Sequence, residues 1–417
     1  MTDAGAAQDG GVTFLGNRRA YWRLLIRGAL LLVVTLGIYR FWLATDVRRY
    51  LWANTEVAGE TLEYTGTPVE LLLGFLVAIA ILVPVYAGFF LAALDLGVIG
   101  QMSGLIAFLA LGVLGQYAVY RARRYRLTRT IYRGLRFHQG GSAWVYAFRA
   151  SLWWIATGIT LGLAYPFQIA SLERYKMRHT FYGDLAGRFD GSGLRLFLRG
   201  LPMWIVIVAP VAVTVGAFVE AVDLQALADA AAAGGGDVLS KIEGTNPALA
   251  GVVVFAMLMG SAAVAFAAVL YPAFQALMLR WWSSGLRFGD IEMHSTLRTT
   301  QVYGAYMRFL GYAILFSIVA AILGALALFL VGTLVAGDKS SVGGELAATA
   351  ILLGGYVIAA LGFSTIYRAT VLLSLWQLGM ESLQLSGLSA LAQVKATGQP
   401  SSAVGEGLAD ALNMGGY

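Results

Sequence analysis

The chain has 417 residues, of which 59% are hydrophobic and 12% are charged. A soluble domain carries about 25% charged residues, so the composition excludes an ordinary soluble domain and indicates an integral membrane protein. The net charge of +6 does not predict nucleic-acid binding, because the basic residues flank apolar stretches, where they set membrane orientation. The absence of cysteine excludes disulfides and thiol chemistry.

The chain begins with a polar segment, residues 1–11, which lacks the features of a signal peptide. Two apolar stretches, 20–43 and 144–170, each join two basic segments. A single crossing would leave one basic flank outside, against the cytoplasmic preference of Lys and Arg. Both stretches contain the same break, Thr35-Leu36-Gly37 and Thr160-Leu161-Gly162. We therefore predict a re-entrant helical hairpin in each stretch, since protein-covered broken helices are tolerated; two full spans are the alternative.

Six further stretches are long and apolar enough to cross a hydrocarbon core of about 30 Å. They are predicted at about 69–93, 105–120, 200–219, 248–279, 309–336 and 346–373. The predicted loop 121–143 contains seven arginines, namely Arg121, Arg123, Arg124, Arg126, Arg129, Arg133 and Arg136. Because cytoplasmic loops collect Lys and Arg, this loop and both chain termini are expected in the cytoplasm. The segments expected outside, with few basic residues, are 94–104, 220–247 and 337–346.

A short signature of alternating apolar and polar residues recurs in the predicted cytoplasmic loops. It occurs at 12–16, 62–66, 135–138, 187–191, 285–289 and 383–387. Such alternation is typical of a half-buried strand. We predict a small cytoplasmic β-sheet made from these loops; separate interfacial turns are the alternative. The expected fold class is thus an all-α polytopic membrane protein with six spanning helices, two re-entrant helical hairpins and this sheet.

The sequence also indicates internal repetition. A shift of about 125 residues aligns Tyr21 with Tyr146 and Arg49-Tyr50 with Arg174-Tyr175. Repeats of this kind are common in membrane transport folds. The predicted organisation is repeat 1 over 1–120, repeat 2 over 121–279, a modified third copy over 280–395 and a partly flexible tail over 396–417.

Several of these residues resemble the YjgN family, a group of bacterial inner-membrane proteins of unknown function. The resemblance rests on Thr35-Leu36-Gly37-Ile38-Tyr39, Trp42, Arg48-Arg49-Tyr50, Asn54-Thr55, Gly59, Tyr64-Thr65-Gly66-Thr67 and the ending Gly405-Glu406-Gly407-Leu408-Ala409-Asp410-Ala411-Leu412. The chain departs from the pattern at Phe41, where a proline is expected before Trp42. The resemblance implies a bacterial cytoplasmic (inner) membrane location, and it implies no activity and no site residues.

Arginines in the hairpins are the candidate binding residues. Arg23 and Arg27 lie one helical turn apart in the first hairpin, and Arg149 lies early in the second. Intramembrane charge is costly and marks functional sites by default, so contact with an anion or a lipid headgroup is one interpretation. Snorkelling of these side chains to the interface is the other.

The three histidines are the remaining candidates for chemistry. His138, His179 and His294 have acidic neighbours but no metal-binding spacing. We therefore predict no catalytic residue, no metal site, no cofactor and no enzymatic activity.

Two functions remain open at this stage. Repeats and broken helices favour a transporter- or channel-like protein for a small solute or lipid. The absence of central Asp, Glu or His from the predicted spans favours a non-transporting scaffold, or a lipid- or partner-binding protein that acts through the sheet. Expected partners are the lipid bilayer and either an anionic lipid or a small solute, with no nucleic acid, and the oligomeric state is not predicted.

Overall fold

The computed structural model describes residues 10–95, 97–221, 247–335, 342–397, 408 and 411–412. The chain divides into two compact units, Met1–Gly193 with Leu279–Tyr417, and Leu194–Met278. Most of the predicted external segments 220–247 and 337–346, and most of the predicted flexible tail, lie outside the described residues.

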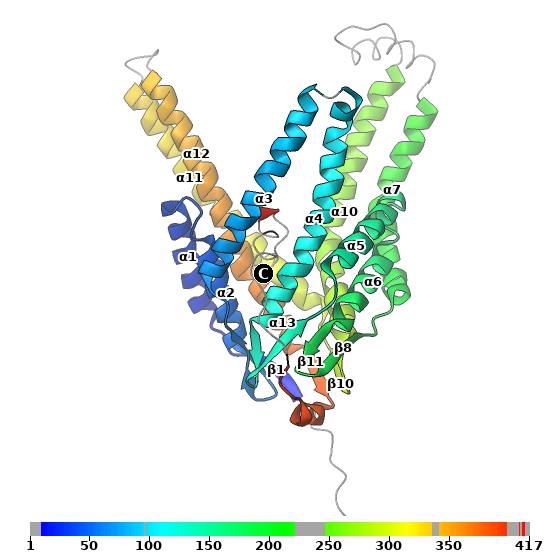
Figure 1. Ribbon diagram of the computed structural model, residues 1–417. Coiled ribbons are helices and arrows are strands. Elements are labelled where there is room, and N and C mark those ends of the chain that lie inside the picture. Colours follow the sequence, from blue (N-terminus) through cyan, green and yellow to red (C-terminus); the bar gives the residue numbers. More distant parts are fainter. Residues whose placement is uncertain are drawn as a thin grey trace, which may run out of the picture. The chain divides into compact units, whose positions relative to one another are not determined.

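In the part of the chain that the structure describes, six helices are long and apolar enough to cross a membrane, which agrees with the predicted number of spans. They are α3 (Pro68–Asp95), α4 (Gly97–Thr128), α7 (Gly193–Ala221), α10 (Pro247–Gly285), α11 (Thr299–Val335) and α12 (Val342–Tyr367). The last of them continues through a π-helical turn, η1 (Arg368–Leu372), into α13 (Leu373–Glu381). In Figure 1, α3 with α4 and α11 with α12 form two antiparallel pairs.

The predicted loop 121–143 is partly wrong, because α4 continues to Thr128. Arg121, Arg123, Arg124 and Arg126 therefore belong to a helix, and only the later arginines lie in turns and strands. Arginine and leucine are good helix formers, and long arginine stems can cover apolar surface while their charged ends point away. The helix thus carries its basic residues past the apolar span into the sheet.

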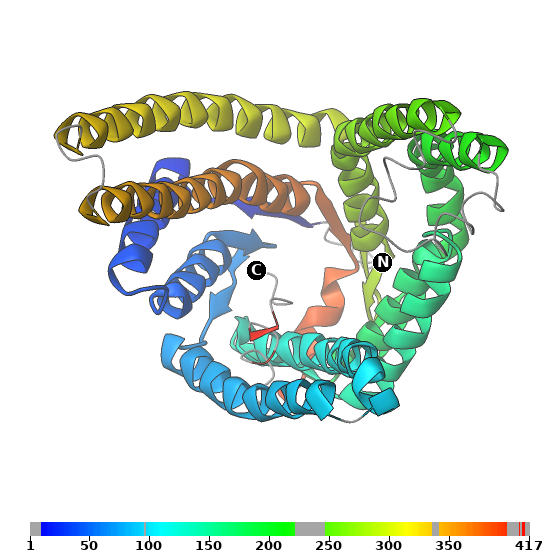
Figure 2. The same cartoon turned by 90° about the horizontal axis from the view of Figure 1, so that it is seen from above.

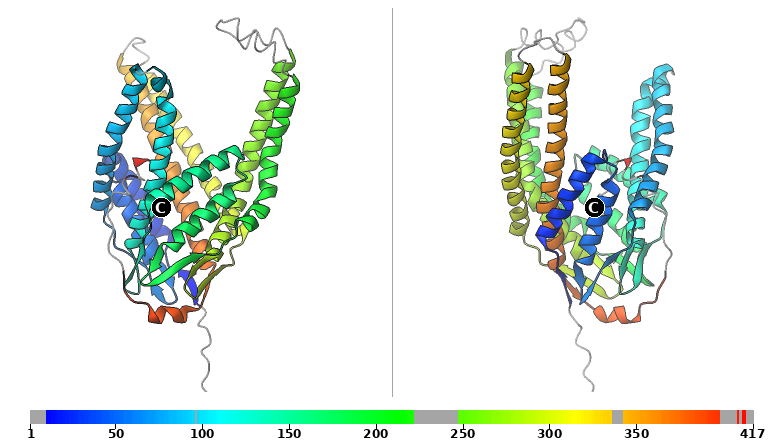
Figure 3. Two further views of the ribbon diagram at one scale, coloured as in Figure 1. Left: turned by 45° about the vertical axis from the view of Figure 1, so that its right-hand side comes forward. Right: turned by 90° about the vertical axis from the view of Figure 1, so that its left-hand side faces the viewer.

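Both predicted hairpin stretches fold as pairs of short helices. The first pair is α1 (Arg18–Val34) with α2 (Arg40–Ala53), and the second is α5 (Ala143–Ile159) with α6 (Tyr165–Arg178). The helices α2 and α6 have 14 residues each, which is about 21 Å at 1.5 Å per residue. This length is too short for a full crossing, so two full spans per stretch do not fit. Figure 3 shows the first hairpin (blue) ending well short of the far ends of α11 and α12.

The two hairpin tips have the same turn. Thr35 Oγ1 donates to the Leu31 carbonyl (2.7 Å) and accepts from the Tyr39 N–H (3.0 Å). Thr160 makes the equivalent bonds with Ala156 (2.8 Å) and Ala164 (3.0 Å). Each threonine hydroxyl thus accepts from the N–H of the residue before the second helix, which the start of that helix leaves without a backbone partner.

A left-handed backbone reverses the chain after each threonine. Leu36 and Leu161 both have φ 50°, and Gly37 and Gly162 have φ 90° and 92°. Leu36 is 93% exposed, so an apolar side chain projects from the tip, as expected if lipid surrounds it.

The left-handed glycine in the second tip gives a stability prediction. Gly162→Ala is expected to destabilise the protein by about 1–2 kcal/mol, because a Cβ is unfavourable at this φ. Gly158→Ala is the matched control: Gly158 is helical, with open space around a Cβ, and alanine should gain about 0.5–1 kcal/mol there. Thermal unfolding in detergent measures both, and equal effects would contradict the prediction.

Among the described residues, eleven strands form one sheet. They are β1 (Gly10–Phe14), β2 (Thr55–Val57), β3 (Glu60–Thr61), β4 (Glu63–Tyr64), β5 (Thr130–Tyr132), β6 (Leu135–Gln139), β7 (Thr180–Tyr182), β8 (Leu185–Phe189), β9 (Leu286–Phe288), β10 (Ile291–Ser295) and β11 (Leu383–Ser386). A strand thus occurs at each of the six predicted positions. The order is β3-β2-β1-β11-β10-β9-β8-β7-β6-β5-β4.

The sheet closes on itself. Its two outermost strands, β3 and β4, are separated in the chain only by Leu62. β3 pairs with β2, and β4 pairs with β5, so the segment 60–64 joins both ends of the strand order. We call this closed assembly the ring sheet.

Four helix–strand hairpin–helix units build most of the ring sheet. In each unit an arginine near the end of the incoming helix donates to a carbonyl 17 residues later, just beyond the hairpin. The pairs are Arg49–Gly66 (3.0 Å), Arg124–Gly141 (2.5 Å), Arg174–Gly191 (3.2 Å) and Arg280–Leu297 (3.4 Å). The predicted shift of about 125 residues superimposes the first and third of these units. The recurring element is shorter than that shift, and duplication of the longer block stays a prediction.

The described part of the C-terminal segment contacts the sheet and the helices α3 and α4. A 3-10 helix, η2 (Leu388–Gln393), follows β11. Further on, Leu408 is buried against Ala78 and Leu82 of α3 and Ala118 and Ala122 of α4. Figure 2 shows this short segment in red beside the two helices.

Candidate functional site

The predicted arginine candidates do not form one site. Arg23 and Arg27 lie on the exposed face of α1, and Arg149 lies on the exposed face of α5, in the other hairpin. The Arg149 guanidinium lies 5.3 Å from the centre of the Tyr175 ring, which is a cation–π contact. Headgroup contact by these arginines stays a prediction, because their placement also fits snorkelling.

The three histidines lie at separate places on the ring sheet. His138 stacks on Phe181 with ring centres 5.0 Å apart, and His179 Nδ1 lies 2.8 Å from the Tyr175 carbonyl oxygen. His294 is exposed on β10. Among the residues that the structure describes, no group of three or more His, Cys, Asp or Glu side chains could hold a metal ion. Burial lowers the pKa of His138.

The inner face of the ring sheet and the adjoining helix ends line an apolar cavity of about 330 Å³. This volume falls at the lower end of the range of about 300–1,000 Å³ for small-molecule sites. The walls come from alternate residues of the strands, because side chains in a strand point to opposite faces. These wall residues are Val12, Val57, Leu62, Thr130, Tyr132, Phe137, Thr180, Tyr182, Leu286, Phe288, Ile291, Met293, Leu383 and Leu385.

The helix ends cover one side of the cavity. Trp52 of α2 and Trp376 of α13 line it and stack with ring centres 5.0 Å apart. Trp52 Nε1 donates to Thr130 Oγ1, and Trp376 Nε1 donates to Thr55 Oγ1, each at 3.0 Å. The two indoles therefore present apolar faces to the cavity while their N–H groups are bonded.

The strand turns and the C-terminal segment cover the opposite side. Leu388 and Leu391 of η2 line the cavity there. Beyond η2, the Lys395 N–H donates to Asp184 Oδ1 (2.9 Å), and the Lys395 carbonyl accepts from the Asp184 N–H (3.1 Å). This short strap holds η2 against the β7–β8 turn.

Most polar groups on the cavity wall have partners. Tyr132 OH donates to the Val57 carbonyl and Tyr182 OH to the Tyr132 carbonyl, both at 2.9 Å. Thr180 Oγ1 donates to the Lys176 carbonyl at 2.8 Å. Burial raises the pKa of Tyr182 to about 12, so this hydroxyl is neutral at physiological pH. The wall is therefore apolar in effect, apart from one charged residue.

That charged residue is Arg123 of α4. Its Nη2 lies 3.4 Å from Met177 Sδ, and its Nη1 is buried without a hydrogen-bond partner among the described residues. Buried polar groups are nearly always bonded, so an unsatisfied guanidinium N–H at an apolar cavity calls for an explanation.

A buried ion pair stands beside Arg123. The Glu173 carboxylate of α6 accepts from Lys176 Nζ and from Trp282 Nε1, the latter at 3.2 Å. Burial opposes ionisation of Glu173, but Lys176 and Arg123 outweigh it and hold the pKa of this carboxyl below its usual value. Burial lowers the pKa of the Lys176 amino group, although Glu173 opposes this shift. Two cations thus surround one anion, leaving an excess positive charge.

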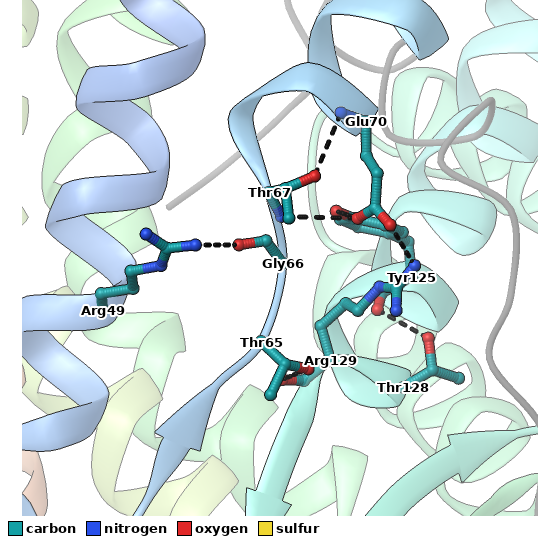
Figure 4. A network of polar contacts seen from close by, with 8 residues as sticks. All are labelled: Arg49, Thr65, Gly66, Thr67, Glu70, Tyr125, Thr128 and Arg129. Atoms are coloured by element: carbon teal, nitrogen blue, oxygen red, sulfur yellow. Dashed lines mark hydrogen bonds and ion pairs between the residues drawn. The ribbon is translucent and has the colours of Figure 1, made fainter.

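A second polar network fixes α4, which carries Arg123, against α3 (Figure 4). Glu70 Oε2 accepts from Tyr125 OH (2.7 Å), and Glu70 Oε1 accepts from Arg129 Nη2 (2.5 Å). The Glu70 N–H also bonds Thr67 Oγ1 at 3.3 Å, while the carboxylate reaches back to the Thr67 N–H. This is a capping box, so the start of α3 and the end of α4 are held by one carboxylate.

Sequence reasoning missed the cavity and its arginine. Arg123 was counted only as one of seven basic residues that set orientation. The available signal was position: Arg123 lies three residues after Tyr120, and both side chains are on the inner side of α4, where Tyr120 is fully buried. Alternation within each strand indicated which residues share a face, but it could not indicate that these faces lie opposite one another.

Comparison with known proteins identifies a family but no activity. Residues 10–411 match the family described as a bacterial protein of unknown function (DUF898). Inner membrane protein YjgN of Escherichia coli O157:H7 is 28% identical over 171 residues, which cover 40% of this chain and 38% of that protein. No solved structure shows a significant match. The chain therefore belongs to the DUF898 family of bacterial proteins of unknown function, and it is similar to the inner-membrane protein YjgN.

Proposed function

We propose that this multi-pass inner-membrane protein binds a lipid, with an acyl chain held in the cavity of the ring sheet. The observation that carries the proposal is the wall of this cavity, which presents an apolar surface because the hydroxyls of its tyrosines and threonines are bonded elsewhere. Water in an apolar cavity finds few hydrogen-bond partners. A cavity of this size therefore stays dry and binds apolar ligands. Three helices whose ends line the cavity, α4, α10 and α13, belong to candidate membrane spans, so lipid is the abundant apolar ligand close by.

Transport of a small solute is the competing hypothesis. It would be supported by a polar cavity between the two helical hairpins. The cavity that supports a function here is instead apolar and lies within the ring sheet, and its lining residues come from strands and helix ends. We therefore favour lipid binding over solute transport. The predicted internal duplication supports neither hypothesis by itself, because fold likeness does not establish function.

Filling the cavity tests the proposal. Met293 faces the cavity and His294, the next residue of β10, is exposed. Met293→Trp is expected to remove most of the lipid that copurifies with the protein, because the indole occupies the acyl-chain volume. His294→Trp is the matched control and should leave lipid content unchanged. Native mass spectrometry in mild detergent measures both, and equal lipid content in the two variants and the parent would refute the proposal.

We further propose that both termini and the ring sheet face the cytoplasm, with the hairpin tips in the bilayer. The basic residues next to the sheet support this orientation. Because the chain has no cysteine, single cysteines report sidedness directly. Asp95→Cys is expected to react with an impermeant maleimide added outside, whereas Ile38→Cys and Leu163→Cys are not. Labelling of either tip from outside would overturn the topology.

A further inference from the structure

The charge at the cavity wall indicates what kind of lipid it holds. Arg123 is the one charged residue that lines the cavity among the residues described. A buried charge is costly unless it is paired. Glu173 is the neighbouring anion, and it already accepts from Lys176 and Trp282. The positive charge of Arg123 therefore lacks a counter-charge of its own.

We propose that the ligand is a single-chain anionic amphiphile, whose carboxylate or phosphate pairs with Arg123 while its acyl chain fills the apolar cavity. This inference rests on the proposed function and adds the ligand's charge. A guanidinium forms paired, charge-assisted hydrogen bonds with either anion. The buried Nη1 of Arg123, without a partner among the described residues, is the donor available for such a bond.

The apolar surroundings strengthen this recognition. In a water-poor site a charged hydrogen bond is worth more than at the surface. Met177, Leu127 and Trp282 line the cavity together with Arg123, so solvent competes little for the guanidinium. A ligand with an uncharged head would leave the arginine unpaired, and the site should discriminate against it.

The test uses bromine as a quencher of the tryptophans that line the cavity, Trp52, Trp282 and Trp376. Delipidated full-length protein in detergent is titrated with dibromostearic acid and, separately, with dibromostearyl alcohol, which has the same chain and no charge. Saturable quenching by the acid at lower concentration than by the alcohol is expected. Displacement of the brominated acid by oleate is then compared with its displacement by lysophosphatidate, which distinguishes a ligand with a carboxylate head from one with a phosphate head.

Variants assign the preference to Arg123. Arg123→Met is expected to weaken binding of the acid roughly 10- to 100-fold, the range for a hydrogen bond to a charged group, with little effect on the alcohol. Arg123→Lys should retain most of the preference. Arg178→Met removes an exposed charge at the end of α6 and should change nothing. If acid and alcohol bind equally and Arg123→Met changes neither, the proposal of an anionic ligand is wrong, while binding of an acyl chain still stands. If neither compound gives saturable quenching, the proposed function itself is wrong.

Discussion

Glu173→Ala is expected to destabilise the protein by about 3–5 kcal/mol, the cost of leaving buried charges without their partner. Glu173 is 8% exposed and is the anion between Lys176 and Arg123. Removing it leaves two cations in an apolar region and frees the Trp282 N–H as well. The free energy of unfolding in mixed micelles, measured by denaturant titration, gives the effect.

Controls separate this charge effect from simple truncation. Glu292→Ala removes an exposed carboxylate that lies 3.5 Å from Arg287, and such surface pairs contribute about 0–1 kcal/mol. The double replacement Glu173→Ala with Lys176→Met should recover part of the loss, because one uncompensated cation is then gone. A loss no larger than that of Glu292→Ala would show that the ion pair contributes little.

The pH dependence of stability provides an independent signature of Glu173. Its pKa in the folded protein lies below its usual value, so ionised Glu173 favours the folded state. This contribution is complete above the ordinary carboxyl pKa of about 4.3. It disappears as the pH falls through the lowered pKa of the folded protein. Glu173→Gln should therefore reduce the loss of stability on acidification relative to the parent protein.

Glu70→Ala is the second substitution with a large expected effect, about 2–3 kcal/mol from lost hydrogen bonds to a charged acceptor. The carboxylate binds Tyr125 in the last turn of α4 and Arg129 just after that helix, and it caps the start of its own helix α3 (Figure 4). Its removal breaks the contact between the start of α3, which follows β4, and the end of α4, which precedes β5. Thermal unfolding in detergent should show a clear decrease in midpoint.

A double-mutant cycle tests whether Glu70 acts through Arg129. If the pair is coupled, Glu70→Ala and Arg129→Ala together should cost less than the sum of the two single changes. Asp190→Ala is the control, since Asp190 pairs with the exposed side chain of Arg188, and its loss should be small. Strict additivity of the Glu70 and Arg129 effects would refute the coupling.

Some elements of this fold could be predicted from local sequence because their causes are local. Apolar length predicts the spans, alternation predicts the strands, and the two Thr-Leu-Gly breaks coincide with the turns at Leu36 and Leu161. In each case the physical cause lies within a few residues: hydrophobic length, strand period and left-handed glycine.

The closed sheet and the cavity could not be predicted in the same way. Pairing of β1 with β11 depends on residues separated by almost the whole chain, and no local pattern encodes such a register. The cavity depends on wall residues from separate hairpins facing one another. Arg123 could be recognised from local sequence only as part of a basic segment, because its burial depends on contact with Met177 of α6, more than 50 residues away.

The pairing of β1 with β11 has a consequence for biosynthesis. β1 leaves the ribosome before the other strands of the ring sheet, but one of its neighbours, β11, is the last of these strands to be made. Until then the nascent chain exposes the free sides of β1 and β10, which are templates for wrong pairing. Loops closed over so long a separation also form slowly. Synthesis must therefore pass β11 before the barrel-like arrangement exists, and chains released before Leu383 are expected to aggregate or be degraded.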